Sequence, residues 1–325
     1  MPVQLMPTVL VSAPYMIPQL GRFRPVLERL GLKLEVADVQ ERLTEDQLLE
    51  KSGTFDGTIC GDDMYTAAVL DACAPRLRAI SKWGTGVDSI DGEACARLGI
   101  KLFRTPNAFT TPVADTVLGY MLAFARRHPW MDAEMKAGNW SKPAAHALSE
   151  RTLGIVGVGN IGKAVARRAR AFGMRVLGND IVEIDHVFLS ETGVEMTNLP
   201  DLLANSDYVS LNCDLNPGSH HLLDSGKFAA MKKGAVLINT ARGPIVDEAA
   251  LVGALRAGSL AGAALDVFET EPLPAGSPLR GMVNVLLAPH NANSSPAAWE
   301  RVHRNTIRNL LEGLEIHHDG PLEKT

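Results

Sequence analysis

Cysteine is scarce in this chain of 325 residues, and its four copies lie far apart. They are Cys60, Cys73, Cys95 and Cys213, and none forms the C-x-x-C pair that many zinc sites and redox motifs use. We therefore expect no metal site and no disulfide framework. Free thiols in a reducing compartment are the simpler expectation, so the protein is predicted to be cytoplasmic.

Runs of one charge and long apolar runs are also missing. Lysine and arginine number 32 against 37 aspartates and glutamates, a net charge of −5 with no basic cluster, so nucleic acid is not an expected partner. The longest strongly apolar stretch, Val117 to Ala125, is too short to span a membrane. No lysine or arginine precedes Arg22, so the start lacks the basic region of a signal peptide. Membrane association is therefore not expected.

The chain does contain a regular alternation of short apolar strands and helical segments, which is typical of parallel α/β domains. The first expected strands are Thr8 to Val11, Leu32 to Val36, Gly57 to Cys60, Leu77 to Ser81 and Lys101 to Phe103. The later ones are Thr152 to Val156, Met174 to Leu177, Tyr208 to Leu211, Ala235 to Asn239, Ala261 to Leu265 and Val283 to Leu287. Between the two sets we expect a long apolar helix, roughly Val113 to Arg127, and then a polar connection from Trp130 to Glu150. A last helix is expected from about Ala297 to Gly313.

One stretch, Arg151 to Asp180, combines a strand, a glycine loop, a helix and a second strand. Gly157 permits a tight turn, Gly159 lets a pyrophosphate approach the backbone, and Gly162 lets the helix pack closely. The helix N-terminus offers free N–H groups to phosphates. A carboxylate at Asp180 can accept hydrogen bonds from ribose hydroxyls and repel a 2′-phosphate. NAD is therefore the predicted cofactor and is favoured over NADP.

Polar side chains follow three neighbouring strands. Arg242, Glu271 and His290 each come shortly after a predicted strand, and Asp266 ends one of them. The carboxyl ends of parallel strands face one crevice, so these groups should surround one nicotinamide. A guanidinium can hold a 2-keto acid and polarise its keto oxygen. A histidine can donate a proton to that oxygen, and a carboxylate on the other ring nitrogen favours the charged imidazole. Asp266 is expected to accept from the nicotinamide carboxamide.

Plainer interpretations of the same residues remain open. Arg242 can cap a strand end, Glu271 can belong to a solvated turn, and His290 can be structural. The segment Ser81-Lys-Trp-Gly-Thr-Gly-Val-Asp88 is equally open. Its glycines leave N–H groups accessible for a small anion, but it also fits a plain strand-to-helix turn with Asp88 as the N-cap.

Several motifs resemble those of the D-isomer-specific 2-hydroxyacid dehydrogenases, in particular the phosphoglycerate dehydrogenase-like members. They are Ser81-Lys-Trp-Gly-Thr-Gly-Val-Asp88, Gly157-Val-Gly-Asn-Ile-Gly162, Ile238-Asn-Thr-Ala-Arg-Gly243, Ile245-Val-Asp-Glu248, Leu265-Asp-Val-Phe-Glu-Thr-Glu-Pro272 and Pro289-His290. The resemblance implies a Rossmann-type doubly wound domain that binds NAD, residues 105–291. It also implies a flavodoxin-like α/β substrate domain, residues 1–104 and 292–325, and a homodimer formed through the helix after Pro112.

The implied activity is NAD-dependent interconversion of a small D-2-hydroxy acid and its 2-keto acid, an oxidoreductase reaction on a CH–OH group. Candidate substrates are 3-phosphoglycerate, glyoxylate and hydroxypyruvate. The implied catalytic residues are Arg242, Glu271 and His290. The expected NAD-binding residues are Thr85, Gly157, Gly159, Asn160, Ile161, Gly162, Asp180, Cys213, Thr240, Ala241, Arg242, Asp266 and Asn293. The expected substrate-binding residues are Lys82, Trp83, Gly84, Thr85 and Arg242.

Three positions depart from the family's pattern, namely Phe109, Asp214 and Asn291. A different class of function is an NAD(H)-sensing binding protein that resembles the C-terminal-binding-protein corepressors. Those proteins act through long disordered tails, which we do not expect in this chain. A formate dehydrogenase-like enzyme would need glutamine where Glu271 stands.

Overall fold

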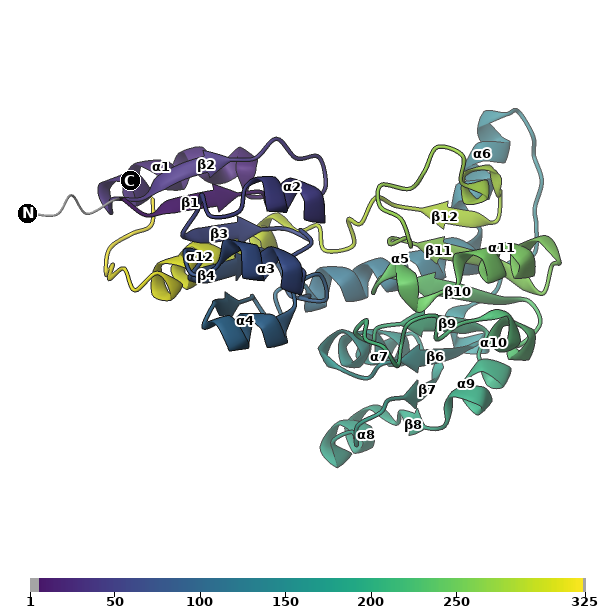
Figure 1. Ribbon diagram of the computed structural model, residues 1–325. Helices are drawn as coiled ribbons and strands as arrows, with labels where there is room; N and C mark the ends of the chain where they lie inside the picture. Colours follow the sequence, from purple (N-terminus) through teal and green to yellow (C-terminus); the bar gives the residue numbers. More distant parts are fainter. Residues whose placement is uncertain (1–5, 324–325) are drawn as a thin grey trace, which may run out of the picture. The chain divides into compact units, whose positions relative to one another are not determined.

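The computed structural model describes residues 6–323, which fold as two compact units (Figure 1). Unit 1 contains the chain up to Ala108 and again from Ser295, and unit 2 runs from Phe109 to Ser294. The divisions lie a few residues beyond the positions 104/105 and 291/292 expected from the sequence. No helix in the described part of the chain is long and apolar enough to cross a membrane.

Unit 1 is built on five parallel strands in the order β2-β1-β3-β4-β5, the flavodoxin-like order. The strands are β1 (Thr8–Val11), β2 (Lys33–Val36), β3 (Gly57–Cys60), β4 (Ala79–Lys82) and β5 (Lys101–Phe103). The helices are η1 (Ile17–Gln19), α1 (Leu20–Arg29), α2 (Glu45–Glu50), α3 (Ala67–Cys73), α4 (Gly92–Leu98) and α12 (Pro296–Gly313). Thr44 and Gln47 form the capping box that their spacing predicts.

The two faces of this sheet are covered by different helices. Leu10, Cys60 and Ile80 point to a core that α2, α3 and α4 complete. On the other face α12 crosses β3, β4 and β5, and Ser81 donates its hydroxyl proton to the Thr306 carbonyl at 2.8 Å. Gly313 lies against Ala79, so α12 runs antiparallel to β4. The first turns of α12 therefore lie at the carboxyl end of the sheet.

Unit 2 is built on seven parallel strands in the order β12-β11-β10-β9-β6-β7-β8. The strands are β6 (Thr152–Val156), β7 (Arg175–Asn179), β8 (Glu195–Met196), β9 (Tyr208–Leu211), β10 (Ala235–Asn239), β11 (Leu260–Leu265) and β12 (Val285–Leu287). The α-helices are α5 (Thr110–Arg126), α6 (His128–Lys136), α7 (Asn160–Ala171), α8 (His186–Thr192), α9 (Leu199–Asn205), α10 (Ser225–Ala230) and α11 (Glu248–Arg256). The short helices are η2 (Leu148–Glu150), η3 (Gly243–Ile245) and η4 (Pro278–Gly281). Reading outward from β6 in both directions gives the doubly wound Rossmann order with one further strand.

Both faces of the second sheet are buried as well. Leu202, Phe228 and Leu251 bring α9, α10 and α11 against one face, and Val117 and Val165 bring α5 and α7 against the other. Because both faces are covered, the strands are continuous apolar runs, which explains why the sequence predicts them.

Four features differ from the sequence expectation. Residues 130–136 of the expected polar connection belong to helix α6 (His128–Lys136). None of the residues of this helix is buried, so the sequence shows no apolar stripe that would predict it. Helix α8 and the exposed two-residue strand β8 were likewise not expected. Finally, Asp91 rather than Asp88 is the N-cap of α4, since its carboxylate accepts from the Ala94 N–H at 2.8 Å.

Candidate functional site

The glycine loop between β6 and α7 has the geometry that its spacing predicts. Gly157 has φ +89°, and a Cβ there would lie 2.5 Å from the Cys213 nitrogen. A Cβ on Gly162 would lie 2.1 Å from the Gly157 oxygen. By contrast, a Cβ on Gly159 would meet no atom within 4 Å, so the space before the N-terminus of α7 is open. The loop can therefore receive a phosphate at the helix N-terminus.

Asp180 follows β7 and fastens this loop. Its carboxylate accepts from the Val158 N–H at 2.6 Å and from the Val182 N–H at 3.1 Å. Two contacts leave lone pairs on the carboxylate oxygens, which can accept further hydrogen bonds. Asp180 thus has the position and the acceptor capacity expected for a ribose partner.

The neighbouring strand ends carry polar atoms that have no protein partner in residues 6–323. Oδ1 of Asn212 follows β9 and Oγ1 of Thr240 follows β10, and both are buried without a hydrogen bond there. A buried polar atom without a partner costs free energy unless a ligand or water satisfies it. Next to Asn212, burial raises the pKa of the Cys213 thiol to about 11, so this side chain is neutral. These atoms fit a polar ligand that lies across the carboxyl ends of the strands, as a dinucleotide does.

His290 and Glu271 meet as the sequence predicts. Nδ1 of His290 lies 2.9 Å from Oε2 of Glu271, and both side chains are about one-fifth exposed, at 23% and 18%. The other carboxylate oxygen of Glu271 accepts from the Phe268 N–H at 2.8 Å. Glu271 is therefore held by the backbone while its other oxygen orients the imidazole through Nδ1.

Asp266 positions the backbone beside His290. The residue is 1% exposed, and its two carboxylate oxygens accept from the N–H groups of Asn291 and Ala292, each at 2.9 Å. Its carbonyl accepts from the His290 N–H at 2.7 Å. His290 has φ +49°, in the left-handed region, so these bonds fix an unusual conformation. Desolvation of this buried group raises the pKa of Asp266 above its ordinary value.

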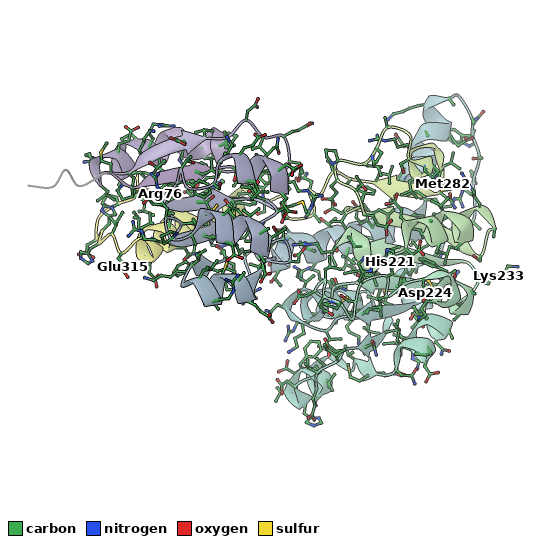
Figure 2. The ribbon with its side chains drawn as sticks, in the orientation of Figure 1. Arg76, His221, Asp224, Lys233, Met282 and Glu315 are labelled. Carbon is green, nitrogen blue, oxygen red and sulfur yellow. The ribbon has the colours of Figure 1, made fainter. Side chains whose placement is uncertain are left out.

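Arg242 follows β10, and Asn239 shapes its turn. The Asn239 side chain donates to the Arg242 carbonyl at 2.9 Å and accepts from the Ala241 N–H at 3.1 Å. Sequence reasoning gave Asn239 no role, although asparagine at a strand end is a recurrent turn former. Close by, His221 contacts the carboxylate of Glu269 in the loop that carries Glu271 (His221 is labelled in Figure 2).

The remaining expected cofactor residues of unit 2 lie on the same edge of the sheet. Asn160 and Ile161 begin α7, Ala241 precedes Arg242, and Asn293 follows β12. The bounds of β6, β9, β10 and β12 place all of them at or beyond carboxyl ends.

In unit 1 the segment 82–86 follows β4. Lys82 is 4% exposed and pairs with Asp62 at 2.8 Å, a partner that sequence reasoning did not identify. Gly84 has φ +127°, and the Thr85 hydroxyl donates to the Thr105 carbonyl at 2.9 Å. The N–H groups of residues 84–86 donate to no backbone carbonyl between positions 6 and 323. They therefore retain the capacity to bind a small anion.

Comparison with known proteins identifies the family. Residues 118–292 match the model of the D-isomer specific 2-hydroxyacid dehydrogenase, NAD binding domain. The chain belongs to the D-isomer specific 2-hydroxyacid dehydrogenases. Similar members include a glyoxylate reductase from Thermofilum pendens, 40% identical over 84% of this chain and 82% of that protein. A D-3-phosphoglycerate dehydrogenase from Methanocaldococcus jannaschii is 37% identical over 89% of this chain but only 55% of that protein.

A solved structure of the same family agrees in fold. The D-lactate dehydrogenase from Aquifex aeolicus, complexed with NAD and lactic acid, has a TM-score of 0.82 and 28% identity. The match covers 97% of this chain and 99% of that one. The family, the two-sheet α/β fold and the NAD-dependent dehydrogenase activity expected from the sequence are therefore confirmed.

Proposed function

We propose that this dehydrogenase reduces a small 2-keto acid to the D-2-hydroxy acid with NADH, using Arg242, Glu271 and His290. The observation that carries the proposal is the 2.9 Å contact between Nδ1 of His290 and Glu271. The arginine follows β10, next to the strand whose loop carries Glu271, and the histidine follows the strand beyond. The carboxyl edge of the sheet thus carries a histidine that can donate a proton, a glutamate that orients this histidine, and an arginine that can bind the substrate carboxylate.

In this mechanism NADH, when bound, supplies the hydride to the keto carbon. The Arg242 guanidinium binds the substrate carboxylate and polarises the keto oxygen. His290 gives the proton on Nε2 to that oxygen while Nδ1–H continues to donate to Glu271. Glu271 therefore fixes which ring nitrogen releases the proton. It also stabilises the charged imidazole before transfer.

We assign the cofactor to the glycine loop of unit 2, with Asp180 on the adenosine ribose and Thr240, Cys213, Asp266 and Asn293 among its contacts. We assign binding of the substrate's acid group to the N–H groups of residues 84–86 and to the ammonium of Lys82. Trp83 is assigned to the same part of the substrate.

We also propose a cytoplasmic homodimer. The four cysteines are free, as expected in a reducing compartment. In unit 2 three large apolar residues are well exposed to solvent: Val283 at 83%, Trp140 at 78% and Met135 at 51%. The indole N–H of Trp130, in α6, donates to the Val283 carbonyl. Exposed apolar side chains around one helix favour a subunit interface on this face.

The test is turnover of NADH with a panel of 2-keto acids: glyoxylate, pyruvate, hydroxypyruvate and 3-phosphohydroxypyruvate. We expect His290→Ala to lower kcat on the order of 10²–10⁴-fold, the range for a lost general acid, and to leave NADH binding unchanged. His317→Ala, on a side chain that is 87% exposed, is the control. Failure of the parent protein to oxidise NADH with any of these acids would reject the proposal.

A further inference from the structure

One histidine, His221, contacts the loops that follow two neighbouring strands of the unit 2 sheet, β10 and β11. Its backbone N–H donates to the Pro244 carbonyl at 2.8 Å, and Pro244 stands two residues after Arg242. Nε2 of its ring contacts a carboxylate oxygen of Glu269, which stands two residues before Glu271. His221 therefore joins the loop that carries Arg242 to the loop that carries Glu271.

The backbone of His221 has a conformation that residues with a side chain rarely adopt. Its φ is +49°, in the left-handed region, and His290 has the same value. Such a conformation costs free energy and persists where the surrounding contacts over-determine it. The ring of His220 stacks on the His221 ring, with centroids 4.1 Å apart and planes 27° apart. The stack and the hydrogen bond to Pro244 thus hold the imidazole on the side where Glu269 lies.

The two loops also pack closely against each other at this point. Gly243 follows Arg242, and a Cβ on Gly243 would lie 1.9 Å from the carbonyl carbon and oxygen of Phe268. The next residue, Glu269, donates its N–H to a carboxylate oxygen of Glu248 at 3.4 Å. Because the loops leave no space between them, a movement of one loop displaces the other.

Glu269 has a reason to move if its imidazole partner is removed. Burial raises the pKa of Glu248, and the negative charge of Glu269 acts in the same direction, so the two carboxylates repel each other. The contact with His221 offsets that repulsion, and it is partly shielded from water, since the two side chains are 40% and 32% exposed. A change in the direction of the Glu269 side chain would reach the short turn in which the Phe268 N–H holds Glu271.

We propose that His221 and Glu269 form a loop clasp, a pair of positioning residues that keeps Arg242 and Glu271 at a fixed separation for catalysis. The inference rests on the proposed function, in which Arg242 binds the substrate carboxylate and Glu271 orients the proton donor. Both members of the clasp act through the backbone of the loops that they join. A displacement of about 1 Å can cost about 10²-fold in rate, so the loss of the clasp should appear in kcat.

The clasp differs in its consequences from an ordinary surface contact, because a partly exposed ion pair often contributes little. Removing a surface pair should change neither kcat nor stability. Removing a purely structural pair should lower the urea midpoint and leave the kcat of the folded protein as it was. Removing the clasp should lower kcat in a protein that remains folded, with the KM for NADH unchanged, because the glycine loop after β6 is untouched.

The experiment measures kcat, the KM for NADH and the KM for the 2-keto acid of the panel that the parent reduces fastest. His221→Asn keeps a residue that tolerates the left-handed backbone, but its amide nitrogen stands where Nδ1 stood and does not reach Glu269. We expect this variant to lower kcat about 10–100-fold. His221→Gln, whose amide reaches as far as Nε2, should retain most of kcat. Glu269→Ala should lower kcat by less than His221→Asn, since the repulsion from Glu248 disappears with the carboxylate.

The double variant His221→Asn/Glu269→Ala shows whether the two residues act as one unit. We expect it to lose no more than His221→Asn alone, because either change already opens the clasp. His186→Asn is the control, since it removes a histidine that contacts Glu183 at 3.6 Å in the same unit, with side chains 88% and 87% exposed.

Circular dichroism and urea unfolding check that each variant is folded. If the larger changes unfold the protein, Glu269→Asp keeps the charge on a shorter side chain and should lower kcat in the same direction by less. Variants that match the parent in kcat, as His186→Asn should, would overturn the clasp and leave the proposed function standing. Single losses that multiply in the double variant would do the same. A parent that oxidises NADH with none of the acids would overturn the proposed function, and this inference with it.

Discussion

The proton that completes the proposed reduction comes from one side chain, His290, and one contact decides how that side chain behaves. Oε2 of Glu271 is 2.9 Å from Nδ1, while Oε1 is occupied by the Phe268 N–H. A carboxylate fixed in this way cannot rotate away from the ring. Its charge therefore acts on the imidazole throughout the reaction, and the pH dependence of catalysis should report it.

We predict that Glu271→Gln moves the falling limb of the reductive pH profile to lower pH. Reduction needs the charged imidazole, so kcat is flat at low pH and falls as the imidazole loses its proton. Removing the negative charge makes that loss easier, while the amide oxygen still accepts a hydrogen bond. The measurement is kcat against pH, with a deuteride isotope effect to show that chemistry limits the rate. Coincident profiles for parent and variant would mean that Glu271 is only a turn residue.

A second prediction at this scale concerns Asp180. We expect the parent to prefer NADH over NADPH, because a 2′-phosphate would approach a carboxylate already fastened to the Val158 N–H at 2.6 Å. Asp180→Ser should narrow that preference in kcat/KM. Glu183→Ser is the control, since it removes an equal charge from a side chain that is 87% exposed nearby. Equal kcat/KM for the two cofactors in the parent would contradict the prediction.

Among the structural elements, the loop between β12 and α12 does most to place the chemistry. It puts His290 in a left-handed conformation and secures it through Asp266, which lies 25 residues away in sequence from Asn291. The carboxylate satisfies two N–H groups that would otherwise lose their partners. We infer that Asp266 is a positioning residue, in addition to its proposed contact with the cofactor.

We predict that Asp266→Asn lowers kcat by on the order of 10–100-fold, since small displacements of reacting groups are costly. An amide can accept one of the two N–H bonds but presents its own donor to the other. The KM for NADH and the thermal midpoint should change much less than kcat. Asp247→Asn removes a comparable carboxylate, the N-cap of α11 that accepts from the Ala250 N–H at 2.9 Å, and serves as the control. If both variants lose the same stability and activity, Asp266 has no special role.

The elements also show what sequence can and cannot predict. Strands such as Gly57–Cys60 and Ala235–Asn239 are found at the predicted bounds, because both faces are buried and their residues are mostly apolar. Helix α6 is missed because none of its residues is buried. Because the carboxyl ends of parallel strands lie at the same edge of a sheet, the sequence predicts that Glu271 and His290 lie close together. It does not predict the left-handed φ of His290 or the hydrogen bonds that the Asp266 carboxylate accepts. Those depend on contacts between distant segments.

At the scale of the whole molecule, the exposed apolar side chains near α6 lead to a prediction about assembly. We expect sedimentation equilibrium to show a dimer. Val283→Asp should shift the equilibrium toward monomer, because the interface would bury an aspartate charge that has no partner. Val187→Asp is the control, because Val187 is 62% exposed on α8 toward the opposite edge of the sheet. An unchanged dimer in Val283→Asp would place the interface elsewhere.

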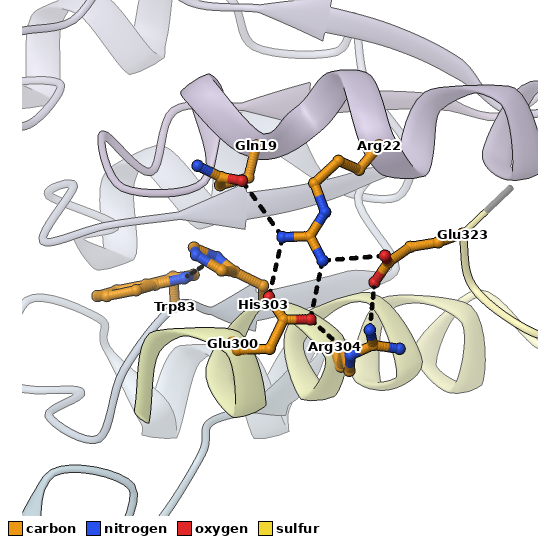
Figure 3. A network of polar contacts seen from close by, with 7 residues as sticks. All are labelled: Gln19, Arg22, Trp83, Glu300, His303, Arg304 and Glu323. Carbon is orange, nitrogen blue, oxygen red and sulfur yellow. Dashed lines mark hydrogen bonds and ion pairs between the residues drawn. The ribbon is translucent and has the colours of Figure 1, made fainter. Parts of the chain in front are cut away.

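Unit 1 is assembled from both ends of the chain, and ion pairs join them. Arg22 of α1 contacts Glu300 of α12 and Glu323 of the C-terminal segment, each at 2.9 Å, and Arg304 contacts the same two carboxylates (Figure 3). The hydrogen bond from Arg22 is the main cause that lowers the pKa of Glu300 from 4.5 to about 2. Since α12 also supports Trp83 through a hydrogen bond to His303, this network helps to hold the proposed substrate unit together.

The lowered pKa fixes the sign of the last prediction. The unfolded chain takes up a proton at Glu300 near pH 4.5, whereas the folded chain does so only near pH 2, so the stabilisation is fully present above 4.5 and is lost as pH falls through about 2. Glu300→Gln should therefore be less stable than the parent at neutral pH, and the difference in urea midpoint should shrink through that window. Because Glu300 is 34% exposed, solvent screening keeps the difference modest, and added salt should reduce it. Glu312→Gln, which changes an exposed glutamate on the same helix, is the control variant. A difference between parent and Glu300→Gln that stays constant from neutral pH to pH 2 would mean that packing of the side chain, and not its charge, joins the two ends of the chain.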